Sequence, residues 1–176
     1  MDSLPAIDLG LMAEHLSAHE GVINKLAAYQ SSVTNMELRN ILKLQEDVMR
    51  SHAWVMLAFI NPNYHNDVEV PPLTSFRIEH EHTSDKLENG NGGNNKWIAL
   101  EAQDTAKNMS TENYNSAMKM QNMNVKNAHI EMALQQNQIK EKYASFIKKM
   151  GWAFAPNATT RAQSNTFLHF EHLLNQ

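Results

Sequence analysis

The sequence repeats itself, and this repeat restricts the fold more than any other feature. The residues Asn-Met-Glu-Leu-Arg-Asn at 35–40 return 87 residues later as Asn-Met-Asn-Val-Lys-Asn at 122–127. Each copy joins two long segments that have a helical pattern. Two copies of one helical hairpin predict a four-helix bundle, so we expect an all-α fold made of two repeated hairpins.

Four segments place apolar side chains on one face at spacings of three and four residues, which is typical of amphipathic helices. These segments span about residues 8–30, 34–60, 96–121 and 124–150. Thr34 followed by Glu37 matches a capping box and predicts the start of the second helix. Gly151 predicts the end of the fourth helix.

The connector between the two hairpins, residues 61–95, has no helical period and contains Pro62, Pro71 and Pro72. A helix of about 24 residues is about 36 Å long, and a connector of roughly 35 residues can easily span that length. We therefore expect a long crossover that returns along the bundle, which is the ferritin-like topology. Residues 68–73 should lie extended against the helices, whereas the Gly- and Asn-rich run 89–95 should be mobile.

A single domain accounts for the whole sequence, residues 1–176. It consists of a first hairpin (8–60), the crossover loop (61–95), a second hairpin (96–151) and a C-terminal tail (152–176). Because the tail would otherwise expose an apolar patch, we expect it to form a short terminal helix that docks on the bundle. Its apolar residues are Phe167, Leu168, Phe170, Leu173 and Leu174.

The composition excludes several classes of function. The chain has no cysteine, which rules out disulfides, thiolate zinc sites and thiol catalysis. The formal net charge is −4 and no basic stripe is present, so neither nucleic acid nor an anionic membrane is expected as a partner. The N-terminus has no leader pattern and no run of about 18 apolar residues occurs, so we expect a soluble product of the cytoplasm.

A di-metal centre is the most specific chemistry that such a bundle could carry. It would need a Glu from each of two helices and a Glu-x-x-His pair from each of the other two. Glu14 and Glu101 are equivalent by the repeat, but Met49 stands three residues before His52 where a carboxylate is required. The fourth helix offers only Gln and Ile at the matching positions 136 and 139. The candidate metal ligands are therefore Glu14, His52 and Glu101, and we expect neither a working di-metal centre nor another cofactor.

The alternative interpretation is a hydrogen-bonded polar layer inside the bundle, which would fix the register of the helices. Its expected members are Glu14, Gln45, His52, Glu101, Asp104 and Gln135. His15 and His19 are four residues apart, a spacing that can bind a metal, but the sequence offers no third ligand. The run Glu-His-Glu-His at 79–82 is expected to be a solvated loop.

Residues 107–157 resemble the Coat F family of spore coat proteins from endospore-forming bacteria. The matching residues are Tyr114-Asn115, Asn122 to Lys126 at the turn, Gln135 to Gln138, Met150-Gly151-Trp152 and Pro156. The first half matches through the repeat, at His19-Glu20 and Leu38-Arg39. Ala153 departs from the family, which usually has Tyr there, and the spacing before Gly151 is shorter.

This resemblance implies a ferritin-like bundle and a role in the spore coat or in its assembly, and it supplies no catalytic residues. We therefore expect a non-catalytic structural protein that is made in the cytoplasm, joins the spore coat, contacts other spore coat proteins and forms homo-oligomers. One competing hypothesis is a ferritin-like metal-binding protein or oxidoreductase with a reduced metal site. A third is a module that binds a small ligand in the polar layer.

Overall fold

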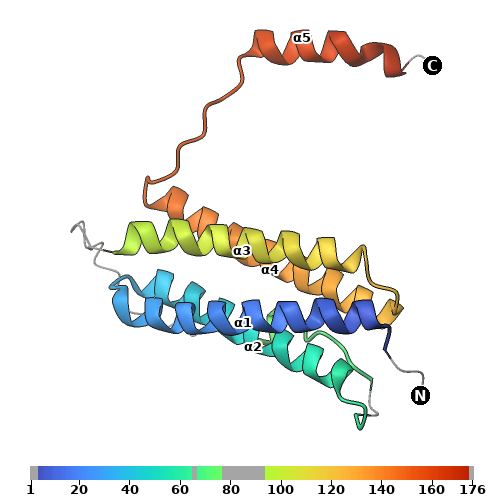
Figure 1. The fold of residues 1–176 in the computed structure, drawn as a ribbon. Helices are drawn as coiled ribbons and strands as arrows, with labels where there is room; N and C mark the ends of the chain where they lie inside the picture. The colour runs from blue at the N-terminus through green and yellow to red at the C-terminus, as the bar shows by residue number, and fades with distance from the viewer. Residues whose placement is uncertain (1–3, 65–66, 77–93, 175–176) are drawn as a thin grey trace.

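The computed structural model describes residues 4–64, 67–76 and 94–174, and these residues form helices without a strand (Figure 1). The expectation of an all-α fold is confirmed. Two 3₁₀ turns, η1 (Leu73–Ser75) and η2 (Glu171–Leu174), accompany five helices in the described part. The helices are α1 (Ala6–Ser32), α2 (Met36–Ile60), α3 (Asn95–Ala117), α4 (Met123–Lys149) and α5 (Thr160–Phe170).

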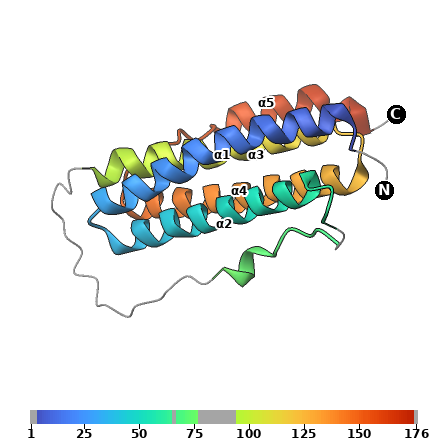
Figure 2. The same cartoon turned by 60° about the horizontal axis from the view of Figure 1, so that its bottom comes forward.

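The first four helices form a bundle in which each hairpin packs on the other. Lys25 on α1 contacts Glu101 on α3, and Asp8, earlier on α1, contacts Gln121, just beyond α3, so these two helices are antiparallel. The backbone N–H of Thr34 also donates to the side chain of Asn95, which places the start of α2 beside the start of α3. Helices α2 and α3 are therefore parallel, and the connector must return along the bundle. Figure 2 shows its described part running beside α2, as a crossover requires. From the repeat we also expect the two hairpins to superpose by a rotation close to a twofold.

The two interhelical turns use the same cap. Asn35 accepts the backbone N–H of Leu38 at 3.0 Å, and Asn122 accepts those of Asn124 and Val125 at 2.9 and 3.2 Å. Both residues belong to the repeated motif, and Asn is among the preferred N-cap residues. The predicted capping box was wrong by one position, because the side chain of Thr34 instead accepts a hydrogen bond from Asn95.

The first helix of each hairpin begins with a side chain that accepts backbone hydrogen bonds from the turn of the other hairpin. The carboxylate of buried Asp8 accepts the backbone N–H groups of Gln121 and Asn122 at 2.9 and 2.8 Å. The side-chain oxygen of Asn95 accepts the backbone N–H of Thr34 at 3.0 Å. Asp8 and Asn95 are 87 residues apart, and so are Thr34 and Gln121. The repeat therefore appears in hydrogen bonds as well as in sequence.

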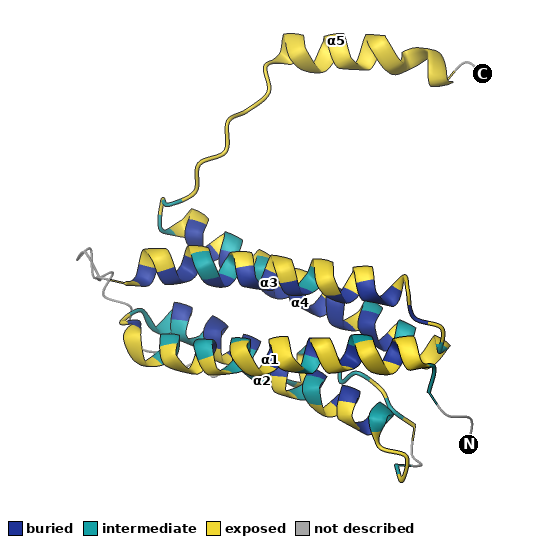
Figure 3. Ribbon diagram, viewed as in Figure 1, coloured by how far each residue is buried: buried dark blue, intermediate teal, exposed yellow. Residues whose placement is uncertain are grey.

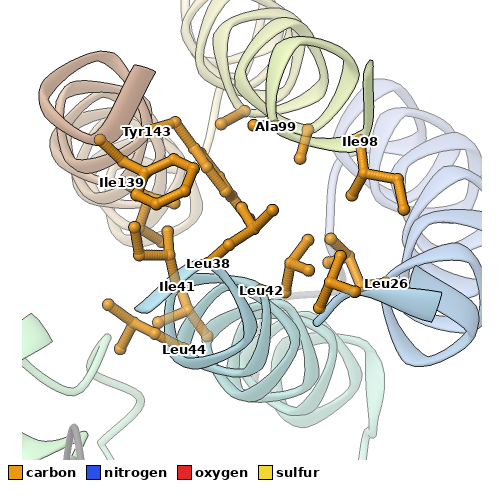
Figure 4. Close-up of a cluster of buried hydrophobic side chains, with 14 of the residues drawn as sticks. Leu26, Leu38, Ile41, Leu42, Leu44, Ile98, Ala99, Ile139 and Tyr143 are labelled. Atoms are coloured by element: carbon orange, nitrogen blue, oxygen red, sulfur yellow. The ribbon is translucent and has the colours of Figure 1, made fainter. Parts of the chain in front are cut away.

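The interior contains two apolar clusters, one toward each end of the bundle. Figure 3 shows buried residues along the four packed helices and an exposed α5. The larger cluster, which we call the first cluster, lies near the turn between α1 and α2; Figure 4 shows side chains of all four helices meeting in it. It includes Leu26, Leu38, Leu42, Ile98, Ile139 and Tyr143. The second cluster lies near the turn between α3 and α4. Its buried members are Met12, Val55, Met56, Met120, Val125, Ala128 and Met132.

The described part of the crossover lies against the bundle, as expected. Val68 and Val70 pack against the second cluster, and Leu73 packs against the first. The carbonyl oxygen of Pro71 accepts a hydrogen bond from the side chain of Gln135 at 2.8 Å. The predicted solvated run 79–82 and most of the predicted mobile run 89–95 lie outside the described residues. Asn95 itself is buried in the first turn of α3, so the expectation of mobility was wrong for that residue.

The C-terminal tail leaves the bundle after a defined stop. Gly151 has φ +70°, and the N–H groups of Gly151 and Trp152 donate to the carbonyls of Lys148 and Ile147, which is a Schellman cap. The predicted terminal helix is present as α5, capped by Thr159, but every described residue beyond Trp152 is exposed. The predicted docking on the bundle was therefore wrong. Figure 1 shows α5 apart from the four packed helices.

Among the described residues, none of the helices is both long enough and apolar enough to span a bilayer.

Candidate functional site: a row of buried histidines

The three candidate metal ligands do not meet. Glu14 is exposed on α1, on the side away from the core. Glu101 is half-buried and forms an ion pair with Lys25, with Nζ and Oε1 separated by 2.8 Å. Since Lys25 lies eleven residues beyond Glu14 on the same helix, about 16 Å along its axis, the two carboxylates are held at different heights. His52 alone lies in the interior.

Only half of the predicted polar layer is buried. Gln45, His52 and Gln135 lie in the core as expected. Asp104 is exposed and accepts a hydrogen bond from Asn108, so it does not belong to the layer, and neither do Glu14 and Glu101. Gln45 accepts the hydroxyl proton of Tyr143 at 2.8 Å and donates to Gln136 at 3.3 Å.

Four histidines form the core of this site instead. His15 and His19 come from α1, His52 from α2 and His129 from α4, and all four are buried. Neighbouring rings follow one another in the order 129, 15, 19, 52, with centroids 5.3, 6.2 and 6.0 Å apart. On α1, α2 and α4 the buried histidines and glutamines lie between or beside residues of the two apolar clusters. We call this arrangement the histidine row.

Hydrogen bonds fix which ring nitrogen carries the proton in His19 and His129. Nδ1 of His19 lies 2.7 Å from the carbonyl oxygen of His15, and Nδ1 of His129 lies 2.9 Å from that of Val125. A carbonyl oxygen can only accept, so Nδ1 is the donor in both rings. Each Nε2 is then an unprotonated acceptor, and neither one has a hydrogen-bond partner among the described residues.

A hydrogen bond to the crossover determines which ring nitrogen of His52 carries the proton. Nε2 of Gln135 donates to the carbonyl of Pro71, so the amide oxygen of Gln135 must face His52, whose Nε2 lies 2.9 Å away. This oxygen can only accept, and His52 is therefore protonated on Nε2. Its Nδ1 has no partner among the described residues. At the other end of the row, Nε2 of His15 lies 2.8 Å from the hydroxyl of Ser116 on α3, which can donate or accept.

Burial keeps the row neutral near pH 7. Desolvation, with smaller contributions from the nearby His19 and His129, lowers the pKa of His52 to about 3 in spite of the hydrogen bond to Gln135. Burial likewise lowers the pKa of His19 and that of His129 to about 4 each. Burial also lowers the pKa of His15, although Glu112 and Glu14 oppose the shift.

His129 was missed by the sequence analysis. It follows Val125 by four residues and precedes Met132 by three, so it lies on the flank of the apolar stripe of α4. The core face of a helix is at least about 100° wide. Counting only the residues along its centre omits core residues at its edge, such as His129. A wider stripe would have identified His129 as a core residue and as a neighbour for His15 and His19.

The histidine row can take up protons, but it is poorly placed for catalysis. The side chains of His19, His52 and His129 are 0% exposed, so no substrate reaches them in this conformation. No group of three or more His, Asp or Glu side chains in the described part of the chain is arranged to hold a metal ion. The rings follow one another in series rather than surrounding a common point.

Comparison with known proteins gives a match in fold alone. No family model matches the sequence, and no curated protein matches it. The structure is similar to the crystal structure of a protein from Bacillus halodurans C-125 described as a "putative spore coat protein". The two chains are 12% identical, the similarity covers 90% of this chain and 97% of the other, and the TM-score is 0.66. At this identity the comparison shows a shared helical fold.

Proposed function

We propose that this protein is a non-catalytic structural or assembly component of the bacterial endospore coat. The observation that carries the proposal is the fold similarity to the protein from Bacillus halodurans, which extends over nearly the full length of both chains. The resemblance of residues 107–157 to the Coat F family points in the same direction and was found independently of the structure. We also propose that the protein is made in the cytoplasm and then incorporated into the coat.

The exposed tail supports a role in assembly. Phe154 is 91% exposed and Leu174 is 75% exposed, and α5 presents further apolar side chains. Exposed apolar residues grouped on one element are typical of sites for protein contacts. We expect the tail to contact other coat proteins or further copies of this chain.

The competing metal-dependent function has no support in the described residues, because Glu14, His52 and Glu101 do not meet. The metal content of untagged protein tests it directly. A stoichiometric transition metal that survives dialysis would favour the ferritin-like oxidoreductase or metal-binding protein over the structural role. Untagged protein is needed because a histidine tag binds metal by itself.

Localisation in sporulating cells tests the main proposal. The chain, carrying a fluorescent protein at its N-terminus, is expressed in a sporulating Bacillus. We expect fluorescence to gather around the forespore and to remain with purified spores after washing in salt. Fluorescence that stays diffuse in the mother cell and is absent from spores would refute the proposal.

A double substitution in the tail serves as the matched comparison. Phe167→Glu with Phe170→Glu changes two exposed side chains, so the bundle should fold as before. We expect this variant to be made normally and to be recovered with spores in a smaller amount. A control variant, Gln163→Glu with Asn165→Glu, introduces two glutamates at exposed polar positions of the same helix. It separates the effect of the added charge from the loss of the apolar side chains.

A further inference from the structure

The buried histidines extend from one end of the bundle to its middle. We call the part built around the second cluster the turn half, because it surrounds the turn between α3 and α4, and the part built around the first cluster the opposite half. His15 and His129 lie beside residues of the second cluster, and His19 and His52 lie midway between the two clusters. The opposite half contains no buried histidine among the described residues.

Protonation of the histidine row would destabilise the packed interior around it. The N–H of each of His19, His52 and His129 is already bonded to a carbonyl or amide oxygen. A second proton on any of these rings would sit on a buried nitrogen that has no acceptor among the described residues. A buried donor without a partner is costly, and a buried charge without a partner is more so.

Neighbouring rings also penalise one another when charged. With centroids 5.3–6.2 Å apart, two imidazolium rings repel in an interior where water screens them little. The acidic groups that act on the row are few. They are Asp8 and Glu14 on α1 and Glu112 on α3; from α2 and α4 the row meets other histidines and the Gln135 amide. Asp8 already accepts two backbone hydrogen bonds, and Glu14 and Glu112 are exposed.

The opposite half has no comparable proton acceptor in its described interior. Its buried polar side chains include Gln45, Tyr143 and Thr105, which stay neutral from pH 7 to pH 4. Its carboxylate Glu101 is paired with Lys25 and Thr105, which hold the pKa of Glu101 below its usual value in spite of partial burial. Mild acid therefore acts on the two halves unequally.

We propose that the histidine row is an acid-sensitive latch. On acidification the turn half opens and releases the part of the crossover held by Val68, Val70 and Pro71, while the opposite half remains packed. The release follows from the chain of contacts that joins His52 through Gln135 to Pro71. Opening exposes the rings to water, where each can carry its charge.

Tryptophan fluorescence can report the two halves separately. Trp54 lies on α2 in the turn half and contacts Tyr64, with centroids 5.9 Å apart. Trp97 contacts Tyr29, and Trp152 contacts Phe146, both in the opposite half. The full chain with Trp97→Phe and Trp152→Phe reports the turn half, and the full chain with Trp54→Phe reports the opposite half. Equilibrium fluorescence is measured in both from pH 7.5 to pH 3.5.

We expect the transition of Trp54 to occur at higher pH than that of the other two tryptophans, by about half a pH unit or more. His52→Leu and His19→Leu, each made in the Trp54 reporter, should lower its midpoint and reduce the protons taken up by about one. Making both guards against the failure of one to fold. His169→Gln changes an exposed histidine on α5 and should leave the transition unchanged.

Three results would overturn the proposal. Coincident transitions in the two reporters would mean that acid unfolds the bundle as one unit. A Trp54 signal that stays constant to pH 3.5, or that is insensitive to both histidine substitutions, would remove the row as the cause. A stoichiometric metal bound at pH 7 would show that the ring nitrogens are occupied as ligands.

Discussion

His52 donates a hydrogen bond to Gln135 across the interface of α2 and α4, with Nε2 and Oε1 separated by 2.9 Å. The direction of this bond is set outside the bundle, since the other end of the Gln135 amide donates to the crossover at Pro71. One side chain therefore connects the core to the connector between the hairpins. The register of α2 against α4 and the path of the crossover depend on each other through it.

Replacing Gln135 should be more damaging than its size suggests. In Gln135→Met the N–H of His52 and the carbonyl of Pro71 both lose their partner, and each loss costs about 1–3 kcal/mol if the group stays buried. We expect the free energy of unfolding in urea to fall by about 2–4 kcal/mol. Gln138→Met changes an exposed glutamine one turn away, and its free energy of unfolding should lie within about 0.5 kcal/mol of that of the parent. Equal losses of stability in Gln135→Met and Gln138→Met would contradict the two hydrogen bonds assigned to Gln135.

Removing His52 should change stability by a few kcal/mol at most, in either direction, and metal content not at all. His52→Leu leaves the oxygen of Gln135 without a donor, but it also removes the unpartnered Nδ1. These effects oppose each other, so we expect a change in the free energy of unfolding of at most about 3 kcal/mol, in either direction. Elemental analysis of untagged parent and variant should give the same result. A metal present in the parent and lost in the variant would revive the metal-binding hypothesis.

Stability should depend steeply on pH below about 6.5. An unfolded histidine takes up a proton near its ordinary pKa of 6.5, whereas burial lowers the pKa of His19 to about 4, that of His129 to about 4 and that of His52 to about 3. The stabilisation is complete above the unfolded pKa and is lost as the pH falls toward the folded values. Three such groups give a slope of up to about 4 kcal/mol per pH unit. Urea unfolding at several pH values from 7.5 to 4.5 measures it, and a flat profile from pH 7 to pH 5 would be inconsistent with neutral buried rings.

The hydrogen bonds that Asp8 and Asn95 make to the turn of the other hairpin should contribute independently to the free energy of unfolding. Asp8→Ala leaves two backbone N–H groups unpaired and should lower the free energy of unfolding by about 2–4 kcal/mol. Asn95→Ala removes two hydrogen bonds to Thr34 and should lower it by about 1–3 kcal/mol. Because the two sites are at opposite ends of the bundle, the double variant should equal their sum within about 0.5 kcal/mol. Asp67→Ala, at an exposed position, is the control.

The tail should matter for association and not for the stability of the bundle. Since every described residue of α5 is exposed, Phe167→Glu with Phe170→Glu should leave the melting temperature within about 2 °C of the parent. Sedimentation velocity should show less self-association than in the parent. Unchanged association would assign the oligomer interface to another surface, and a large loss of stability would mean that the tail docks on its own bundle in solution.

The sequence predicted the hairpins well because their patterns are local. The segments predicted for α2 and α4 are helical as expected, and the apolar face of α4 from Val125 to Phe146 is buried. Asn35 and Asn122 are equivalent in the repeat, but the first cap was predicted one residue too early, at Thr34, and the shared cap was not identified. Periodicity and turn chemistry act within a few residues, so one sequence suffices to read them.

The site was harder to predict because it depends on which face of a helix is turned inward. Glu14 follows Met12 by two residues, which rotates it by about 200° and places it on the opposite face. It therefore could not join His52, whose neighbour on α1 is His19. Glu101 lies at the edge of the α3 stripe, where a charged side chain can reach solvent and pair with Lys25. The docking of α5 could not be decided from sequence, since the same apolar residues would suit either this bundle or another molecule.

Each hairpin caps its own second helix, but its turn also needs a residue of the other hairpin. The acceptor for the turn after α1 is Asn95, and the acceptor for the turn after α3 is Asp8, so each hairpin depends on the first residues of the other. A free-standing ancestor with this arrangement would have been complete only as a symmetric pair, in which each molecule capped its partner. The crossover keeps the two hairpins in one chain, so each turn meets the residue that completes it without a bimolecular encounter.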